Sequence, residues 1–336
     1  MKLIIQIPCL NEEEQLPLTI SELPREVQGF DIVEWLIIDD GSTDRTVEVA
    51  TELGVDHIVS LPANVGLARA FQQGLQAALA LGADVVVNTD ADRQYPASSI
   101  PALVAPILAG RADVVIGDRG VGEVADFSRL KRRLQTLGSG VVSAVAGTAI
   151  PDATSGFRAY SRRAAQSVVV VNSYTYTLES AIQASKKGLT IRSVPIEKNP
   201  ATRESRLFRS TSSYVRKSTG TIVRVFASYE PLRFFGGLAA LCALAGLGAF
   251  VPFLWSAIVD GDTDGHLQSI ILGAIFMIAA VQLLALAVVG DLVHAHRVVS
   301  ERTLEAVRRL ELSDNPTRPP YLVHTNDPRW PAPVES

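Results

Sequence analysis

The sequence predicts an α/β domain with a mostly parallel sheet, followed by a hairpin of two helices that are long enough to cross a membrane. Three observations carry this prediction. Short apolar segments alternate with amphipathic segments through the first half of the chain, as in repeated strand–helix units. Acidic residues follow several apolar segments, which is where open parallel sheets bind ligands. Two long stretches without charged residues come later.

The first two predicted strands each end in a polar, acidic segment. Leu3–Ile7 is followed by Pro8-Cys-Leu-Asn-Glu-Glu-Glu14, and Trp35–Ile38 is followed by Asp39-Asp-Gly-Ser-Thr-Asp44. A carboxylate at the end of such a strand can accept hydrogen bonds from a nucleobase or a ribose. The alternative is that these acids only complement the amino terminus of a following helix.

The next segments continue the alternation of strand and helix. His57–Leu61 predicts a short strand, and Asn64–Leu81 predicts a helix because large apolar residues recur every four positions. The first strand is not followed by Gly-x-Gly-x-x-Gly, and the chain has no Walker loop. These absences from the sequence argue against a dinucleotide oxidoreductase or a P-loop enzyme.

The segment Val85–Pro96 combines a buried strand with two carboxylates. Its three valines are typical of a strand that is covered on both faces. Asp90 and Asp92 are two residues apart, so in an extended chain both carboxylates point to one side. Mg²⁺ takes one or two protein carboxylates together with phosphate oxygens and water. The segment therefore predicts a divalent cation beside a nucleotide diphosphate, with a solvated turn as the alternative.

The chain then completes the predicted domain. Ala112–Gly117 and Leu189–Glu197 predict strands, and Arg129–Gly147 and Tyr174–Gly188 predict helices. Between these helices lies Asp152-Ala-Thr-Ser-Gly-Phe-Arg-Ala-Tyr-Ser161, in which Gly156 permits a close approach of the backbone. Arg158 carries a guanidinium that suits phosphate, although a structural salt bridge explains it equally well.

Two uncharged stretches follow, of 26 residues at Phe234–Val259 and 24 residues at Leu267–Gly290. Each is long enough for a transmembrane helix, with spans at about 233–259 and 267–292; the alternative is a pair of buried helices in a soluble core. Residues Lys198–Arg233 carry eight Lys and Arg against two Glu, whereas Asp260–His266 carries three Asp. The positive-inside rule therefore predicts a cytoplasmic catalytic domain, cytoplasmic termini and an external hairpin loop.

The remaining segments complete the predicted organisation. We expect residues 206–232 to form an interfacial amphipathic helix and residues 294–312 a cytoplasmic helix with one apolar side. The Pro-rich residues 313–336 predict a disordered tail, and residues 1–205 form the catalytic domain. The two cysteines, Cys9 and Cys242, lie in different environments and are not expected to pair.

Taken together, these motifs resemble inverting family 2 glycosyltransferases of the Rossmann-like GT-A fold, and within them the polyisoprenyl-phosphate glycosyltransferases of the dolichol-phosphate mannose synthase and bactoprenol glucosyltransferase type. The resemblance covers roughly residues 1 to 310. The motifs that carry it are Pro8–Glu13, Asp39–Asp44, Asp90–Asp92 with Gln94 and Pro96, Gly117–Arg119, and Ser155–Arg158.

The resemblance implies a metal-dependent hexosyltransferase that uses GDP-mannose or a UDP-sugar as donor and a polyisoprenyl phosphate as acceptor. It implies Mg²⁺ or Mn²⁺ at Asp90 and Asp92, and a tetramer in contact with membrane lipids but with no nucleic acid. The catalytic group would be Asp90, Asp92, Asp152 and Arg158. The nucleotide-sugar site would be Pro8, Leu10, Asn11, Glu12, Ile37, Asp39, Asp40, Asp90, Ala91, Asp92, Gln94 and Arg119. The acceptor phosphate would meet Ser155, Arg158, Arg203 and Arg206.

One segment departs from the family pattern. The family commonly has an Arg, a short spacer and Gly-Glu-Ser-Lys before the membrane segment, whereas this chain has Pro200-Ala-Thr-Arg-Glu-Ser-Arg206. Arg206 keeps the charge of the usual Lys, and Arg203 is a candidate replacement for the missing Arg. Two alternatives stay open: another family 2 transferase that makes polysaccharide or glycolipid, and a non-catalytic membrane scaffold.

Overall fold

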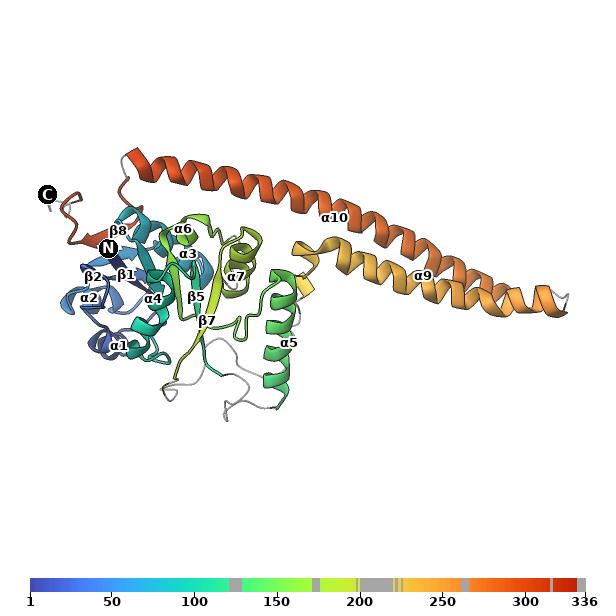
Figure 1. Ribbon diagram of the computed structural model, residues 1–336, viewed down its shortest axis with the longest axis horizontal. Coiled ribbons are helices and arrows are strands. Elements are labelled where there is room, and N and C mark those ends of the chain that lie inside the picture. The colour runs from blue at the N-terminus through green and yellow to red at the C-terminus, as the bar shows by residue number, and fades with distance from the viewer. Residues whose placement is uncertain are drawn as a thin grey trace. The chain divides into compact units, whose positions relative to one another are not determined.

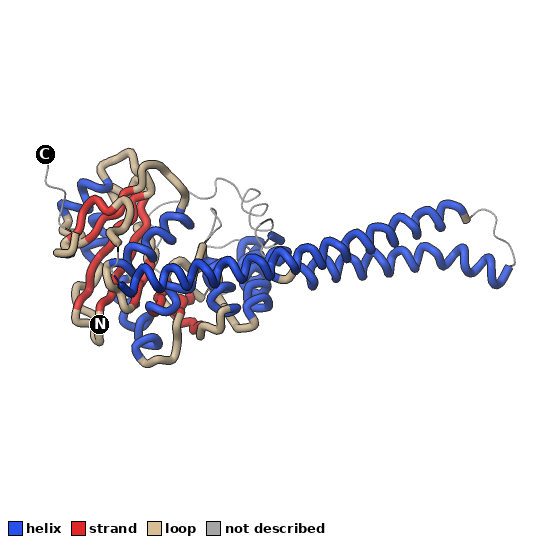
Figure 2. Tube along the Cα trace, turned by 90° about the horizontal axis from the view of Figure 1, so that it is seen from above, coloured by secondary structure: helices blue, strands red, loops and turns tan. Residues whose placement is uncertain are grey.

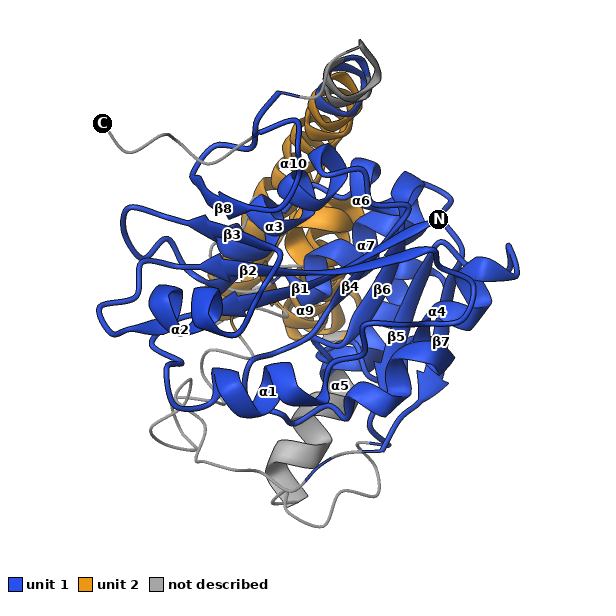
Figure 3. Ribbon diagram, turned by 90° about the vertical axis from the view of Figure 1, so that its left-hand side faces the viewer, with its two compact units in different colours: residues 1–218, 304–336 blue, residues 219–303 orange. Residues whose placement is uncertain are grey.

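The chain divides into two compact units. Unit 1 comprises Met1–Ser218 and Leu304–Ser336, and unit 2 comprises Thr219–Thr303 (Figure 3). This computed structural model describes residues 1–120, 129–170, 176–197, 199, 220, 223–224, 226–260, 266–314 and 317–330. Unit 1 therefore joins the predicted catalytic domain to the C-terminal segment, so the domain is not confined to residues 1–205.

Unit 1 is built from alternating strands and helices (Figure 1). The strands are β1 (Lys2–Cys9), β2 (Ile32–Asp39), β3 (His57–Ser60), β4 (Val85–Asn88), β5 (Val114–Asp118), β6 (Arg158–Ser161), β7 (Ile191–Pro195) and β8 (Leu322–Thr325). The helices are α1 (Leu16–Glu22), α2 (Thr46–Glu52), α3 (Leu67–Ala80), the 3₁₀ turn η1 (Ala97–Ser99), α4 (Ile100–Leu108), α5 (Arg129–Ala146), α6 (Arg162–Ser167) and α7 (Thr177–Lys186). The predicted alternation is confirmed.

The strands form one mixed sheet in the order β7-β5-β6-β4-β1-β2-β3-β8, drawn red in Figure 2. Strand β1 is parallel to β2 and β4, and β5 is parallel to β7, whereas β6 and β8 are antiparallel to their neighbours. The chain runs outward from β1 through β2 to β3 and then crosses to β4 on the other side of β1. Such a switch in strand order leaves a crevice at the carboxyl ends of the two central strands.

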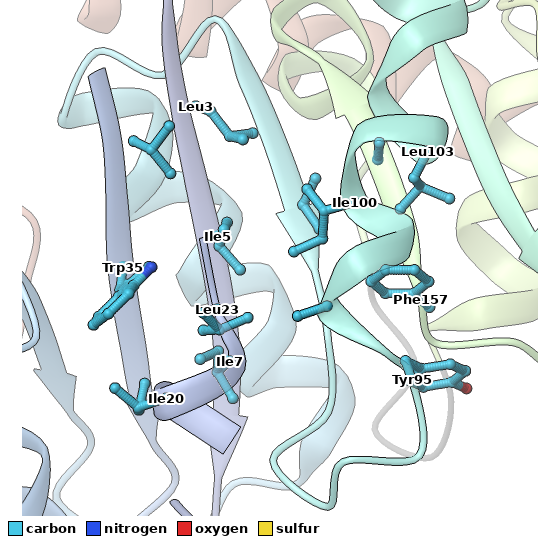
Figure 4. Close-up of a cluster of buried hydrophobic side chains, with 14 of the residues drawn as sticks. Leu3, Ile5, Ile7, Ile20, Leu23, Trp35, Tyr95, Ile100, Leu103 and Phe157 are labelled. Atoms are coloured by element: carbon cyan, nitrogen blue, oxygen red, sulfur yellow. The ribbon is translucent and has the colours of Figure 1, made fainter. Parts of the chain in front are cut away.

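The central strands are buried on both faces, as their apolar sequences predict. Leu3, Ile5 and Ile7 of β1 share a buried cluster with Ile20 of α1 and Ile100 of α4 (Figure 4). Helix α3 packs against β1 and β2 and also contacts α6. Burial on both faces holds the ends of β1, β2 and β4 in fixed positions, so the loops that follow them start from a rigid support.

The C-terminal segment corrects one prediction. Residues 313–336 were expected to be disordered, but β8 pairs with β3 and Leu322 is buried. The physical reason is that β3 would otherwise be an edge strand with one side of its backbone unpaired. The alternating segment Tyr321-Leu-Val-His-Thr325 supplies a short strand, and its apolar Leu322 is covered in the process.

Unit 2 contains the long apolar helix α9 (Pro231–Trp255), which continues into the π-helical turn η2 (Ser256–Asp260). It also contains most of α10 (Leu267–Asp314), whose residues from Leu304 onward belong to unit 1. The apolar stretches Pro231–Val259 and Leu267–Val307 are long and apolar enough to cross a membrane. Large side chains such as Leu244 and Val281 are about two-thirds exposed, at 67% and 64%. Within the described part of the chain these helices are therefore mostly exposed, unlike the core helices of a soluble domain.

Helix α10 also differs from the prediction. It was expected to end near residue 292 and to be followed by a separate helix over 294–312, but it continues to Asp314. No glycine or proline lies between Asp291 and Asp314, so the sequence contains no residue that would break it. The predicted interfacial helix over 206–232 and the hairpin loop at 261–265 lie largely outside the described residues.

Candidate active site

The loops that follow β1 and β2 are tied together at the switch point. The Asn11 amide donates to Ser42 Oγ at 2.9 Å, the Thr43 amide donates to Asn11 Oδ1 at 2.8 Å, and the Glu12 amide donates to Thr46 Oγ1 at 2.9 Å. Asn11 has a φ of 55°, a left-handed conformation that asparagine adopts more readily than most residues. The two loops line a polar hollow formed by Asn11, Glu12, Glu13, Glu14, Gln15, Thr43 and Asp44.

Asp39 and Asp40 are buried at the end of β2, and each has a separate set of partners. Asp39 accepts from the Ser42 amide at 3.0 Å and from the Ser60 hydroxyl at 2.8 Å. Asp40 accepts from the amides of Val65 and Gly66 at 2.8 and 3.0 Å, just before α3. Burial raises the pKa of Asp40, although these two amides favour its charged form. Asp40 thus connects β2 to the start of α3.

The predicted nucleotide residues from β1 and β2 lie at neighbouring strand ends but differ in exposure. Pro8 is the buried penultimate residue of β1, and Leu10 and Asn11 are half-buried in the loop after it. Glu12 is 8% exposed. Ile37, in contrast, is fully buried within the hydrophobic cluster, so it supports the site from the core and does not line an open pocket.

Asp90 and Asp92 follow β4 on the other side of the crevice. Asp92 accepts from the Gln94 amide at 3.1 Å and from Gln94 Nε2 at 2.7 Å, which fixes its carboxylate. Burial, followed by the negative charge of Asp92, raises the pKa of Asp90. A cation between these two like charges would relieve their repulsion, so the pair fits a divalent ion. Among the described residues, no group of three or more His, Cys, Asp or Glu surrounds one point, so substrate and water oxygens would complete the shell.

Gly156 packs directly against Asp90 and is fixed by hydrogen bonds on both its amide and its carbonyl. Its amide donates to Tyr95 Oη at 3.1 Å, and its carbonyl accepts from Asn88 Nδ2 at 2.9 Å and from Tyr176 Oη at 3.3 Å. A Cβ on residue 156 would lie 2.8 Å from Tyr176 Oη and 3.1 Å from Asp90 Oδ2. Only glycine therefore allows this close approach.

Sequence reasoning missed three of these residues, Asn88, Tyr95 and Tyr176. Tyr95 stands between Gln94 and Pro96, so its position inside a motif was a usable signal. Burial raises the pKa of Tyr95 to about 12, which keeps its hydroxyl protonated at neutral pH. Asn88 and Tyr176 are 88 residues apart and meet only in the fold, at 2.9 Å between Nδ2 and Oη.

Arg119 and Asp152 form a two-point ion pair. Arg119 Nε donates to Asp152 Oδ2 at 2.6 Å and Nη2 donates to Oδ1 at 2.9 Å, while Thr154 Oγ1 also donates to Asp152. Burial alone would raise the pKa of Asp152, but the hydrogen bonds and charge of Arg119 outweigh burial and lower it. Asp152 is therefore ionised at neutral pH, and its cationic partner is Arg119.

The structure places Arg158 and Ser155, the predicted contacts of the acceptor phosphate, in the interior of the domain. Both are fully buried. The Arg158 guanidinium donates to the carbonyls of Ser155, Thr177 and Ala153 at 2.7–2.8 Å, and to the Ser180 hydroxyl at 3.0 Å. Arg158 thus holds the loop before β6 against α7. The other predicted acceptor residues, Arg203 and Arg206, lie outside the described residues.

A doubly wound sheet with a pair of carboxylates at its switch point defines a nucleotide-binding domain of the α/β class. Comparison with known proteins narrows this class. Residues 4–169 match the model of Glycosyl transferase family 2. The chain is 30% identical over 206 residues to a dolichyl-phosphate hexose transferase of Haloferax volcanii. The matched region covers 61% of this chain and 86% of that protein. The chain belongs to glycosyl transferase family 2.

Two further similarities agree with this family. An undecaprenyl-phosphate mannosyltransferase of Micrococcus luteus is 28% identical over 206 residues, covering 58% of this chain and 83% of that one. A glucosyl-3-phosphoglycerate synthase from Mycobacterium tuberculosis, solved with Mn²⁺, UDP and glucosyl-3-phosphoglycerate, superimposes with a TM-score of 0.53 at 24% identity, covering 67% of this chain and 79% of that one. The expected GT-A fold and glycosyltransferase class are confirmed.

Proposed function

We propose that the protein transfers a hexose from a nucleotide sugar to the phosphate of a polyisoprenyl phosphate, with inversion at the anomeric carbon. The observation that carries this proposal is the presence, in one chain, of a carboxylate pair at the switch point and of two long helices with exposed apolar side chains. A lipid acceptor requires the second feature and a nucleotide donor requires the first. The names of the relatives from Haloferax volcanii and Micrococcus luteus support the same acceptor class.

Each group of the site has a role in this reaction. Asp90 and Asp92 would hold a divalent cation, Mg²⁺ or Mn²⁺, which when bound supplies positive charge to the diphosphate leaving group. Gln94 fixes Asp92, and Gly156 lets the backbone of the preceding loop approach Asp90. Asp152 holds the Arg119 guanidinium in one orientation, so that Arg119 faces the donor with a fixed charge.

The acceptor needs no strong protein base. A phosphate monoester has a second pKa near 6, so at neutral pH the lipid phosphate is largely a dianion and can attack without help. Its oxygen forms the new bond to the anomeric carbon while the bond to the nucleotide diphosphate breaks on the opposite face. Asp152 is held by Arg119 and has a lowered pKa, which fits an orienting role and not proton abstraction.

The basic segment before the first apolar helix would receive the acceptor phosphate. Residues Lys198–Arg233 contain eight Lys and Arg against two Glu, including Arg203 and Arg206. This charge distribution favours a cytoplasmic catalytic unit, cytoplasmic termini and an external loop.

We also propose that the protein is a homo-oligomer, and specifically a tetramer. Size-exclusion chromatography with light scattering in nanodiscs tests this, and a monodisperse monomer would refute it.

The reaction is tested with the full chain in nanodiscs, incubated with labelled GDP-mannose, UDP-glucose and other nucleotide sugars together with short polyprenyl phosphates and Mg²⁺ or Mn²⁺. We expect one donor to give a lipid-linked monosaccharide of inverted anomeric configuration, identified by mass spectrometry and NMR. A polymeric product would favour a polysaccharide synthase. A failure to label any lipid phosphate under all donor and metal combinations would reject the proposed function.

A further inference from the structure

The C-terminal strand reaches the strand that supports the proposed donor site. Strand β8 pairs antiparallel with β3, with Thr325 opposite His57 and His324 opposite Ile58. One contact extends beyond the regular pairing, because the Ser60 amide donates to the Tyr321 carbonyl at 2.9 Å. Tyr321 makes this contact in a left-handed backbone conformation, with a φ of 63°.

Side chains hold this segment in one register. Thr325 Oγ1 lies 2.8 Å from Nδ1 of the fully buried His57, whose Nε2 lies 2.8 Å from Glu34 Oε2. The Asn326 amide donates to the Asp56 carbonyl at 3.0 Å. Arg329 Nη2 donates to the Ala80 carbonyl at the end of α3 at 3.1 Å. These contacts involve β2, β3 and α3, so the segment is docked by specific partners along its length.

Ser60 links this docked segment to the proposed donor site. Its backbone amide is held by Tyr321, and its hydroxyl donates to Asp39 Oδ2 at 2.8 Å. The next residue, Leu61, donates its amide to the Asp39 carbonyl at 2.9 Å. Asp39 is 2% exposed and also accepts from the Ser42 amide in the loop that is bound to Asn11. The backbone at Ser60 therefore determines how the Asp39 carboxylate is presented.

We infer that the C-terminal segment formed by Tyr321 and strand β8 supports the nucleotide site, because Tyr321, held in place by β8, positions Ser60, and Ser60 orients Asp39. The inference rests on the proposed function, in which Asp39 binds the nucleoside of the donor. Tyr321 and Ser60 are positioning residues, since they act through Asp39. The segment after the membrane helices therefore controls donor affinity, although it is distant in sequence from every motif of the catalytic domain.

The test uses two substitutions at Tyr321 that differ in backbone preference. Tyr321→Pro forces φ to about −65°, which turns the carbonyl away from Ser60, whereas Tyr321→Gly accepts the positive φ. Both variants remove the Tyr321 side chain, which is 52% exposed, so a difference between them reports the backbone and not the loss of the ring. Ser60→Ala removes the hydroxyl, and Ser21→Ala, whose hydroxyl bonds at an exposed position to the Leu18 carbonyl, is its control.

Binding of UDP and of GDP in the presence of Mg²⁺ is measured by calorimetry, and the KM for the donor is measured separately from kcat. We expect Tyr321→Pro and Ser60→Ala each to weaken binding and raise KM by about five- to tenfold, with kcat within about twofold of wild type. Ser21→Ala should match wild type, and Tyr321→Gly, which permits the positive φ, should lose clearly less affinity than Tyr321→Pro. The double variant Ser60→Ala/Tyr321→Pro should have no lower nucleotide affinity than the single variant with the lower affinity. The reason is that both changes act through the same hydrogen bond to Asp39.

The outcomes separate this inference from the proposed function. Wild-type affinity in Tyr321→Pro, or additive losses in the double variant, would overturn the role of β8 while leaving the transferase proposal intact. A wild-type protein that binds neither UDP nor GDP would reject the donor site itself. If circular dichroism shows that Tyr321→Pro unfolds, Thr325→Val replaces it, since this variant removes the hydroxyl beside His57. The expected direction and the decision are then the same.

Discussion

Three carboxylates near the ends of β4 and β5 are held by different partners. Asp152 is paired with Arg119, Asp92 accepts two hydrogen bonds from Gln94, and Asp90 packs against Gly156 with a raised pKa. A carboxylate with a raised pKa is destabilised in its charged form, so a bound cation stabilises it most. Asp90 and Asp92 are therefore the metal candidates, and Asp152 is an anchor for Arg119.

The first prediction concerns Asp92. We expect Asp92→Asn to lower kcat/KM by at least about 100-fold, because the variant loses a charge that would hold the cation at the leaving group. The melting temperature should stay within a few degrees of wild type, since Asp92 lies outside the core. Asp31→Asn, at a carboxylate that is 85% exposed, is the control. Full activity of Asp92→Asn, or of wild type in excess chelator, would refute the metal assignment.

The second prediction is the pH dependence of the Asp152 ion pair. The folded protein lowers the pKa of Asp152, so near pH 4 the folded state binds fewer protons than the unfolded state. The stabilisation is fully present above the ordinary pKa of about 3.9 and is lost as the pH falls below it. We expect the difference in melting temperature between wild type and Asp152→Asn to be constant from about pH 5 to 7 and to narrow below about pH 4.

The kinetic consequence of the same variant distinguishes an anchor from a base. Both proteins should show an acidic limb near pH 6 in kcat/KM, which reports the lipid phosphate. The loss in Asp152→Asn should be modest. A loss of about a thousandfold together with disappearance of that limb would identify Asp152 as a general base.

Whether a contact in the site could be predicted depends on how far apart its two residues are in the sequence. The sequence predicted that Asp90 and Asp92 act together because they are two residues apart, but β4 ends at Asn88 and residues 91–92 form a turn, so the extended conformation assumed for them was wrong. Arg158 could not be assigned in the same way, because its partners Thr177 and Ser180 lie on α7 and the sequence does not show that they surround it. The charge of Arg158 suggested a phosphate ligand, whereas in the fold its buried guanidinium donates hydrogen bonds to backbone carbonyls.

At the scale of elements, the loop from Asp152 to Phe157 connects β6 to the carboxylates. The third prediction is that Gly156→Ala lowers kcat/KM by more than tenfold and destabilises the protein by about 1–3 kcal/mol, because its Cβ would overlap Tyr176 Oη and crowd Asp90. Gly140→Ala on α5 is the matched control, since its Cβ meets open space. That variant should keep full activity; equal behaviour of the two alanine variants would contradict the close packing.

The elements also show where local patterns suffice. Strands β1, β2 and β4 could be predicted because their apolar runs are buried on both faces. Strand β8 could not, because a short strand beside prolines carries a weak signal and its pairing depends on the free edge of β3. The break expected near residue 293 was placed where apolar residues give way to charged ones, but a change of surroundings does not end a helix that lacks glycine and proline.

At the scale of the whole molecule, unit 2 carries the two helices that are long and apolar enough to cross a membrane. Its helices pack against each other closely, since a Cβ on Gly273 would lie 2.8 Å from the Phe250 ring, and their other faces are apolar and exposed. No apolar partner covers these faces within the described part of unit 2. In the proposed membrane-anchored enzyme, acyl chains would cover these faces.

The fourth prediction tests this environment. Ile278 of α10 is 59% exposed and lies in the middle of the uncharged stretch Leu267–Gly290. Replacement by Arg should cost about 2.5–3.5 kcal/mol of insertion free energy, so a smaller fraction of Ile278→Arg should resist extraction with alkaline carbonate. Ile278→Val is the control and should behave as wild type. Equal extraction of the Arg variant would indicate that this face does not contact lipid.

The position of β8 has a consequence for biosynthesis. Unit 1 is assembled from two stretches of chain that flank unit 2, and the strand on the outer side of β3 is translated after both apolar helices. The two apolar helices are therefore translated while β3 is still a bare edge of the sheet. A nascent chain that stalls within them lacks both β8 and the Tyr321 carbonyl that accepts from the Ser60 amide.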